Sequence, residues 1–426
     1  MRRAGVAADP SVAAAVADAH RNEWAFVFAA TVRLTRDLDL AEECVQDAYA
    51  KALTAWASGG IPEKPGAWLT TVARRRAVDL IRREATLRRS LPLLLEDADE
   101  LGRVPDGTDQ PEDASHGIGD DRLRLIFTCC HPALSSEARV ALTLRLVCGL
   151  STAEVARAFL VSQPTMTARI TRAKKKIAAA RIPYRVPPAD ELPERTEAVL
   201  DVVNLLFTTG HTAPAGDELV RRDLVERALD LARMLRALLP KDAEVAELLA
   251  LVLLTDARRN SRVDAEGRLV LLADQDRELW DREAIEEGTE LVREALRWRP
   301  PGRFALMAAI AAVHAEAPTF EETDWAEIVG LYDLLVEAWP SPVVALNRAV
   351  AVGFAAGPAA GLVALAPLSA EPRLAGYGYL AAARADFLRQ LGRADEARTQ
   401  YEEALLLTEN APEREFLTTR LQQLGQ

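Results

Sequence analysis

The chain has 426 residues, of which 49% are hydrophobic and 27% are charged. This length predicts two or three domains, and the composition excludes collagen-like, disulfide-scaffold and largely disordered proteins. Four cysteines in so long a chain indicate a reducing compartment. The N-terminal residues lack the apolar core of a signal peptide, and no stretch has the roughly 18 apolar residues of a membrane helix. We therefore expect a cytoplasmic protein without membrane contact.

Charge is unevenly distributed along the chain. The formal net charge is −12, yet residues 1–185 hold 27 Lys and Arg against 23 Asp and Glu. Ten of those acids fall within 96–121, so the segments on either side are strongly basic. Residues 186–426 carry 25 basic and 41 acidic side chains. This asymmetry is typical of a DNA-binding half joined to a regulatory or partner-binding half, although Arg-rich helices with solvated faces would give the same counts.

The spacing of apolar residues predicts an all-α fold. Apolar residues recur every three to four positions, and sustained alternation of β-branched residues is absent. Clusters of Pro and Gly divide the chain into a helical block at 11–90, an acidic flexible linker at 91–119, a second helical block at 120–182 and a helical array at 194–426.

Two helices are distinctive in the first block. Residues 37–56 predict an amphipathic helix with an acidic polar face, whose inward positions are Ala41, Val45, Ala48, Ala52 and Trp56. Residues 66–83 predict a helix with a dense arginine face beside an apolar stripe of Trp68, Leu69, Val72, Val78 and Ile81. Taken alone, the acids indicate a solvated helix face and the tryptophans indicate core aromatics.

The second block contains the pattern of a helix-turn-helix. Ser151 and Glu154 form a capping-box pattern that opens a short helix. Ser162 can cap a second helix with Pro164 in its first turn, and its inward positions are Met166, Ile170 and Ala173. Polar and basic residues on the other faces suit a recognition helix in the major groove, with lysines at phosphates. The alternative is an αα-hairpin with a basic solvent face.

The two blocks together resemble regions 2 and 4 of extracytoplasmic-function (ECF) sigma factors of the sigma-70 superfamily. Region 2 is matched by Gln46-Asp47, Trp68-Leu69 and Arg82-Arg83, although Arg75 stands where family members usually have Asn. Region 4 is matched by Glu154, Val155, Ala156, Thr165, Arg169, Arg172 and Ala173. The resemblance covers residues 11–182 and implies an RNA polymerase sigma factor, which directs promoter-specific transcription initiation.

The resemblance also implies roles for individual residues. The acidic helix would dock on core RNA polymerase through Asp39, Glu42, Glu43, Gln46 and Asp47. The arginine-rich helix would melt and capture the −10 promoter element through Trp68, Arg74, Arg75, Arg76, Asp79, Arg82 and Arg83. The helix-turn-helix would read the −35 element through Gln163, Thr165, Thr167, Arg169, Arg172, Lys174, Lys175 and Lys176.

The C-terminal array resembles the helical extension fused to one subgroup of these sigma factors. The matching stretches include 204–207, 254–259, 274–277, 308–315 and 347–351. The resemblance implies that the extension regulates activity in place of a separate anti-sigma factor, and a protein partner for it is expected. Gly357 and Gly392 lie 35 residues apart, close to the roughly 34-residue tetratricopeptide (TPR) period. This spacing predicts a TPR-like array, and a helical solenoid without true repeats is an equally good alternative.

Other polar residues have ordinary structural interpretations. Cys129 and Cys130 diverge on a helix and lack CxxC partners, so we expect buried small hydrophobes and no metal. Asp274 and Asp276 are expected to form structural ion pairs with Arg258, Arg259, Arg277 or Arg348, although a ligand site is the alternative. His314 is expected to be a hydrogen-bonded core histidine. The sequence lacks a phosphate loop, a nucleophile elbow and a His-Glu-x-x-His motif, which predicts a protein that is not an enzyme and needs no cofactor.

Two alternative functions remain at the level of sequence. The chain could be a helix-turn-helix regulator that binds DNA without joining polymerase, in which case the acidic helix has no docking role. It could also be a helical-repeat scaffold whose first block binds protein, in which case retention on DNA or heparin would be insensitive to salt.

Overall fold

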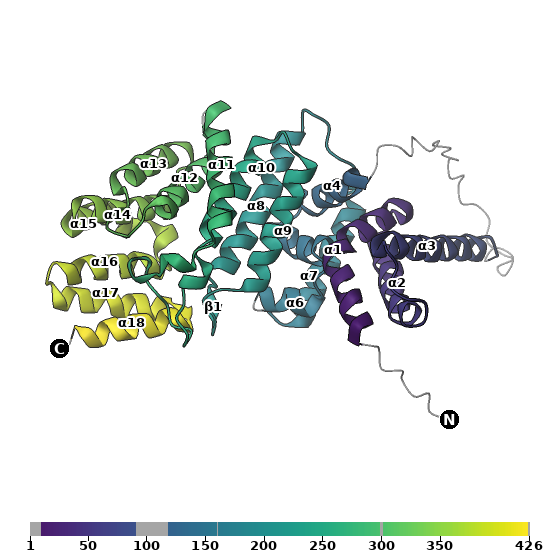
Figure 1. Cartoon of the computed structure of the whole chain (residues 1–426), viewed down its shortest axis with the longest axis horizontal. Helices are drawn as coiled ribbons and strands as arrows, with labels where there is room; N and C mark the ends of the chain where they lie inside the picture. The colour runs from purple at the N-terminus through teal and green to yellow at the C-terminus, as the bar shows by residue number, and fades with distance from the viewer. Residues whose placement is uncertain (1–9, 91–117, 160, 299–300, 425–426) are drawn as a thin grey trace, which may run out of the picture. The chain divides into compact units, whose positions relative to one another are not determined.

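The computed structural model describes residues 10–90, 118–159, 161–298 and 301–424 (Figure 1). Within these ranges the chain is built from helices α1 to α18, and the strands β1 and β2 have two residues each. The all-α prediction is therefore confirmed. The chain divides into two compact units, Met1–Val202 (unit 1) and Val203–Gln426 (unit 2). The predicted acidic linker, 91–119, lies outside the described residues except for its last two positions, which belong to α4.

Unit 1 begins with three packed helices, α1 (Pro10–Thr35), α2 (Leu38–Gly59) and α3 (Pro65–Ser90). Asp37 caps α2, because its carboxylate accepts hydrogen bonds from the backbone N–H groups of Asp39 and Leu40 at 2.8 and 2.9 Å. The helix ends before Gly60, whose φ of +83° suits glycine. All five predicted inward positions of α2 are buried, which confirms the amphipathic prediction.

The second part of unit 1 holds α4 (Ile118–Cys129), α5 (Ser136–Leu142), a π-helical turn (Thr143–Val147), α6 (Thr152–Ala158) and α7 (Gln163–Ala179). The two parts of the unit share a core. The indole Nε1 of Trp24 on α1 donates to the carbonyl of Leu146 at 2.9 Å. The hydroxyl of Tyr184 donates to the carbonyls of Ala29 and Asp121 at 3.0 and 3.1 Å. Both predicted DNA-binding blocks therefore belong to one compact unit.

Gly149 marks a close approach between the two parts of unit 1. Its φ is +74°, and a Cβ at this position would lie 2.7 Å from Cγ of Trp24. Trp24 in turn stacks on Phe28 and Tyr49, with ring centroids 5.7 and 6.0 Å apart. A side chain at position 149 would therefore strain the backbone and displace an aromatic cluster.

Helix α8 (Leu192–His211) spans the boundary between the units. Unit 2 continues with α9 (Arg222–Leu238), α10 (Ala243–Asp256) and α11 (Arg282–Trp298). Every residue of α10 from Val245 to Leu254 is buried, as expected of a helix that is surrounded by others. Three short 3₁₀ turns, Arg259–Ser261, Leu272–Asp274 and Arg277–Leu279, connect α10 to α11.

In the rest of unit 2, successive helices share small cores. Leu306, Ile328 and Val344 join α12 (Arg303–Glu316), α13 (Trp325–Ala338) and α14 (Pro342–Ala356). Leu346, Leu365 and Phe387 join α14 to α15 (Pro358–Leu365) and α16 (Gly378–Gln390). Ala385, Tyr401 and Leu417 join α16 to α17 (Ala394–Leu407) and α18 (Ala411–Gln423). The TPR-like character of this array stays a prediction.

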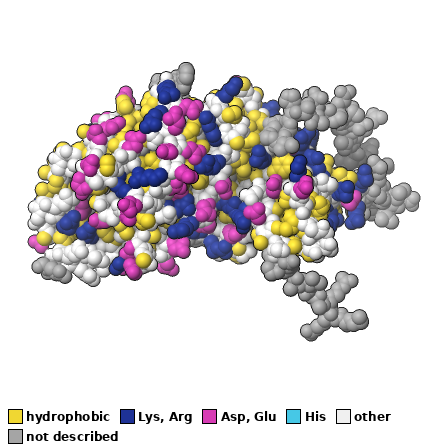
Figure 2. All heavy atoms as spheres, in the orientation of Figure 1, with side chains coloured by type: hydrophobic (Ala, Val, Ile, Leu, Met, Phe, Trp, Pro, Cys, Tyr) yellow, Lys and Arg dark blue, Asp and Glu magenta, His cyan; other side chains and the backbone are white. Residues whose placement is uncertain are grey.

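A small parallel bridge links the first and last parts of unit 2. Strand β1 (Ala215–Gly216) pairs with β2 (Glu409–Asn410). The buried side-chain amide of Asn410 donates to the carbonyls of Ala213 and Glu218 at 3.1 and 2.9 Å. The array is therefore tied end to end within the unit. On the visible face of unit 2, acidic and basic side chains are intermingled (Figure 2). Among the described residues, none of the helices has the length and apolarity needed to cross a membrane.

Candidate polymerase and nucleic-acid interfaces

The acidic face of α2 is set by the burial of its opposite face. Because Ala41, Val45 and Ala48 pack inward, Asp39, Glu43 and Gln46 are exposed, and Asp47 lies at the edge of the core. Glu42 differs from the rest, since its side chain is only 15% exposed. The predicted docking residues thus form one surface with a half-buried carboxylate at its centre.

Two cations from the second part of unit 1 bind this surface. The ammonium of Lys174 on α7 lies 2.7 Å from carboxylate oxygens of both Asp39 and Glu42. Arg145, in the π-helical turn, forms an ion pair with Glu42 and donates to the carbonyl of Leu150 at 2.8 Å. We refer to Asp39, Glu42, Arg145 and Lys174 as the α2 charge cluster.

The two carboxylates of the α2 charge cluster shift the pKa of Lys174. The Lys174 side chain is only 9% exposed, and burial by itself favours the neutral amine. The hydrogen bonds from its ammonium to Asp39 and Glu42 outweigh burial, so the pKa of Lys174 is raised above its ordinary value. Lys174 is therefore charged at neutral pH and held against α2.

Arg76 connects the two sets of residues predicted in the first block. Its Nε lies 2.8 Å from a carboxylate oxygen of Asp47, and its Nη2 lies 3.4 Å from one of Glu43. A residue predicted to contact the −10 element thus neutralises two residues predicted to contact polymerase. Arg76 turns inward because it lies on the side of α3 that packs on α2.

The outward face of α3 carries the remaining predicted −10 residues. Arg74, Arg75, Arg82 and Arg83 are exposed. Asp79 is exposed between them, four residues after Arg75 and four before Arg83, and so reduces the local positive potential. Trp68 is half-buried with its ring edge-on to Trp56, at a centroid distance of 5.7 Å.

The predicted apolar stripe of α3 is partly wrong. The residues that are fully buried are Leu69, Ala73 and Ala77, whereas Ile81 is 36% exposed. The C-terminal part of α3 extends past α1 and α2 (Figure 1), so an apolar residue there has no helix to cover it. Small alanines fill the contact instead, because they allow close approach of the neighbouring helices.

The helix-turn-helix prediction is confirmed in its local structure. Ser151 and Glu154 form both hydrogen bonds of a capping box at the start of α6, and Ser162 caps α7. Met166, Ile170 and Ala173 are buried, as predicted. Gln163, Thr167 and Arg172 lie with Thr171 along an exposed shallow depression of α7. Residue 160, in the turn, lies outside the described residues.

The other predicted −35 residues have different surroundings. Thr165 is exposed, and its backbone N–H donates to the Ser162 cap at 3.3 Å. Arg169 is half-buried over the ring of Phe159, with its guanidinium carbon 5.5 Å from the ring centroid. Lys175 and Lys176 are exposed, whereas Lys174 belongs to the α2 charge cluster. The lysine run is therefore split between solvent and the interior of unit 1.

Sequence reasoning missed Arg145 and misjudged the surroundings of Lys174. Lys174 follows Ile170 by four residues and precedes Ile177 by three, which places it on the buried stripe of α7. Residues 140–147 are apolar except for Thr143 and Arg145. A charged residue at an inward position is the signal that could have pointed to both, because such a charge needs a partner.

The cysteines behave as buried hydrophobes, as predicted. Cys129 and Cys130 are buried, and burial raises the pKa of both thiols, that of Cys130 to about 11. The Sγ of Cys130 lies 3.4 Å from the hydroxyl oxygen of Thr143. In the ranges that the structure describes, no group of three or more His, Cys, Asp or Glu residues is arranged to hold a metal ion.

The ion pairs expected for Asp274 and Asp276 are wrong in the described part of the chain. Arg259 binds Asp256 on the preceding turn, and Arg348 binds Asp333. Arg277 donates to the carbonyls of His314 and Ala317 at 2.7 and 2.6 Å. Asp276 instead caps the turn at Arg277–Leu279 by accepting from the backbone N–H of Glu278. Arg259, Arg277 and Arg348 thus bind acceptors other than these two aspartates.

The sequence matches known protein families. Residues 24–86 match the Sigma-70 region 2 family, and residues 124–177 match the Sigma-70, region 4 family. Residues 195–296 match a family of unknown function (DUF6596). The chain is 28% identical to the probable ECF RNA polymerase sigma factor SigI of Mycobacterium tuberculosis, over 41% of this chain and 58% of that protein. The chain belongs to the ECF group of the sigma-70 family.

Two further relatives differ in how much of the chain they match. The ECF RNA polymerase sigma factor SigG of Mycobacterium tuberculosis is 29% identical over 35% of this chain and 44% of that protein. An uncharacterized protein of Rhizobium meliloti is 45% identical over 93% of this chain and 92% of its own length. This sigma factor therefore shares its C-terminal extension with at least one relative. Region 2 is formed by α1–α3 and region 4 by α4–α7.

Proposed function

We propose that this sigma factor joins core RNA polymerase through the acidic face of α2 and directs initiation at promoters with distinct −10 and −35 elements. We further propose that residues 194–426 form a C-terminal domain that regulates this activity. The single observation that carries the proposal is the presence of both sigma-70 regions, in family order, within one compact unit.

The exposed part of the acidic face supports polymerase docking. Asp39, Glu43 and Gln46 are accessible, and a run of carboxylates suits a basic partner surface. Glu42 and Asp39 are already bound by Arg145 and Lys174, so full docking requires these ion pairs to be exchanged for contacts with polymerase. We propose that region 4 swings away from α2 when the holoenzyme forms.

The outward arginines of α3 support capture of the −10 element. Arg75, Arg82 and Arg83 share one face and can follow the backbone of a displaced strand. Half-buried Trp68, braced by Trp56, offers an aromatic surface beside that face. Such a surface suits an unstacked base. In this conformation Arg76 forms ion pairs with Glu43 and Asp47 of α2, so its role is to position these two acids.

The exposed N-terminal half of α7 supports recognition of the −35 element. Gln163 and Arg172 carry side chains that hydrogen-bond base edges or phosphates, and Lys175 and Lys176 add positive charge. Lys174 can reach phosphate only after it leaves the α2 charge cluster. DNA binding by region 4 and docking of α2 are thereby linked through one lysine.

The docking proposal is tested with the double variant Glu43→Lys and Asp47→Lys in the full chain. Reversal of two interface charges should weaken binding to core polymerase by at least about tenfold, and run-off transcription should fall with it. Binding is measured by titration of fluorescently labelled protein with core enzyme. Glu197→Lys, an exposed charge reversal on α8, is the matched control.

Arg76→Gln separates docking from positioning. It frees Glu43 and Asp47 without changing their charge, so core binding should be retained. If Arg76→Gln weakens binding as much as the double reversal does, the acids act by holding α3 and the docking assignment is overturned. If the double reversal leaves binding to core unchanged, the alternative of a DNA-binding regulator that acts without polymerase is favoured.

A further inference from the structure

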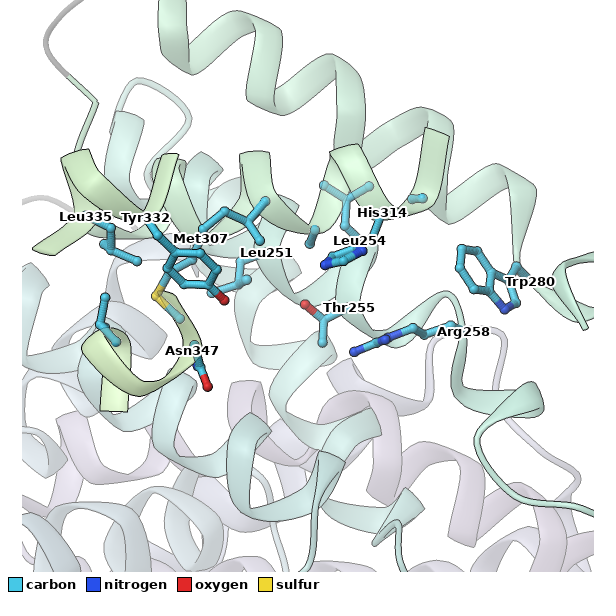
Figure 3. Close-up of a pocket in the computed structure, with 14 residues that line it drawn as sticks. Leu251, Leu254, Thr255, Arg258, Trp280, Met307, His314, Tyr332, Leu335 and Asn347 are labelled. Atoms are coloured by element: carbon cyan, nitrogen blue, oxygen red, sulfur yellow. The ribbon is translucent and has the colours of Figure 1, made fainter. Parts of the chain in front are cut away.

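Unit 2 contains a cavity of about 210 Å³ between α10, α12, α13 and α14 (Figure 3). Its wall is mainly apolar and includes Leu251, Leu254, Met307 and Leu335. Trp280 closes one end, where its indole Nε1 donates to the hydroxyl of Ser261 at 2.8 Å. The volume is below the roughly 300 Å³ of pockets for drug-sized ligands, so only a small molecule would fit.

One cationic side chain enters this apolar space. Arg258 follows the end of α10, and its guanidinium extends into the cavity toward Thr255, beneath His314 (Figure 3). In the described part of the chain, the Arg258 side chain forms no hydrogen bond or ion pair. Burial lowers the pKa of Arg258, the neighbouring Tyr332 opposes that shift, and Arg277 adds to it. The cation is thus held in the cavity wall without a carboxylate.

The other arginines of this segment bind acceptors within the chain, although the Nη2 of Arg277 is buried without a hydrogen-bond partner in the described residues. Arg259 is bound by Asp256, and Arg262 donates to the backbone carbonyl of His211 and to the hydroxyl of Thr212. Arg277 donates to two carbonyls and lies over the ring of Trp280 at 4.5 Å. The Arg258 side chain is half-buried beside the apolar wall of the cavity, and a guanidinium in such a place suits a carboxylate acceptor that a ligand can supply.

Further polar groups converge on the same space. The Nδ1 atom of His314 is buried and lacks a hydrogen-bond partner, so the prediction of a hydrogen-bonded core histidine is wrong for this atom. Burial lowers the pKa of His314 to about 4, which keeps the ring neutral at pH 7. The hydroxyls of Thr255 and Tyr332 also face the cavity, and Asn347 lies at its exposed rim.

We propose that this cavity binds a small organic carboxylate, with the carboxylate on Arg258 and the apolar body against Leu251, Met307 and Leu335. One planar guanidinium matches a carboxylate in bidentate geometry. A phosphate dianion would favour a second cation, whereas Arg259 is bound by Asp256 and Arg277 already donates to two backbone carbonyls. This binding site goes beyond the proposed sigma function and does not rest on it.

The experiment measures thermal unfolding of the full chain with benzoate or hexanoate, and with the matched neutral amides benzamide and hexanamide. We expect one or both acids at millimolar concentration to raise the melting temperature by about 2–4 °C, and the amides to leave it unchanged. In Arg258→Met the acids should have no effect. Arg348→Met, which removes an arginine of α14 that binds Asp333, is the matched control and should respond as the wild type does.

A second readout tests whether Arg258 serves binding or the fold. Without ligand, Arg258→Met should melt at or above the wild-type temperature, because it replaces a half-buried cation that has no hydrogen-bond partner in the described residues with an apolar side chain. A lower melting temperature, with no acid response in the wild type, overturns the proposal. Stabilisation by the acids in Arg258→Met also overturns it, and stabilisation of the wild type by inorganic phosphate but not by the acids overturns the carboxylate assignment. None of these outcomes depends on transcription, so the test is separate from that of the sigma function.

Discussion

Single residues fix the contact between regions 2 and 4. Glu42 accepts from both Arg145 and Lys174, so one carboxylate joins α2 to two elements more than 100 residues away in the sequence. Gly149 allows the backbone to pass against the ring of Trp24. Neither Glu42 nor Gly149 is distinctive within its own segment of the sequence. Each matters because of the residues it contacts in the other region, which are Arg145 and Lys174 for Glu42 and Trp24 for Gly149.

Gly149→Ala should destabilise unit 1 strongly. The added Cβ would overlap the ring of Trp24, and the φ of +74° is unfavourable for alanine. We expect a loss of about 2–4 kcal/mol in the free energy of unfolding. Urea unfolding monitored by circular dichroism measures this loss. Gly59→Ala, where a Cβ meets open space, is the control and should change stability little.

At the scale of elements, α7 serves two surfaces. Its N-terminal half presents exposed polar residues, while Lys174 in its C-terminal half binds α2. The raised pKa of Lys174 means that its contribution to stability is present below the pKa of the unfolded chain and is lost only as pH rises through the folded-state value. The contact is therefore insensitive to pH near neutrality and sensitive to competition by other cations.

Lys174→Gln should loosen region 4 from α2. The change removes both hydrogen bonds to Asp39 and Glu42, of which only the latter is well buried, since the Asp39 side chain is 80% exposed. We expect a loss of about 1–3 kcal/mol in the free energy of unfolding, with faster amide hydrogen exchange in α2. We also expect tighter binding to core polymerase.

The neighbouring exposed lysine provides the control for that prediction. Lys176→Gln removes the same charge from α7 without touching α2, so stability and hydrogen exchange should stay as in the wild type. Unchanged exchange in α2 of Lys174→Gln would show that the ion pairs do not hold the two regions together. Equal or weaker core binding would show that they do not compete with polymerase.

At the scale of the whole molecule, each unit is closed by contacts that are remote in sequence. In unit 1, Trp24 and Tyr184 join the two sigma regions. In unit 2, Asn410 binds two carbonyls that lie 192 and 197 residues earlier in the chain. A helical array with such a tie unfolds more cooperatively than one stabilised by nearest neighbours alone.

Asn410→Ala should therefore destabilise unit 2 as a whole. It leaves the carbonyls of Ala213, which is buried, and of Glu218 without the Asn410 donor, and it removes the cap of α18, whose Glu413 N–H donates to Asn410. We expect a loss of about 2–4 kcal/mol in the free energy of unfolding, because one buried carbonyl loses its donor and α18 loses its cap. Chemical unfolding of the full chain gives the value. Gln390→Ala, which removes an exposed hydrogen bond to Asp386, should be nearly neutral, and an equal loss in both variants would contradict the proposed tie.

The sequence by itself determined the helices and the order of the two sigma regions. Apolar spacing, the Ser151–Glu154 box, the Ser162 cap and the inward positions of α2 and α7 are local properties, and each was recovered from residues within a few turns. Burial of Cys129 and Cys130 followed from the same kind of local reasoning.

Only the tertiary structure decided which charged residues face solvent. Arg76 and Lys174 are basic residues of the kind that contact DNA, yet both form ion pairs with acids of α2. Arg258 and His314 line a cavity. The physical reason is that helical periodicity identifies an inward position but not the partner that makes a charge tolerable there. For Lys174 that partner lies more than 130 residues away, and for Arg258 the chain supplies none in its described part.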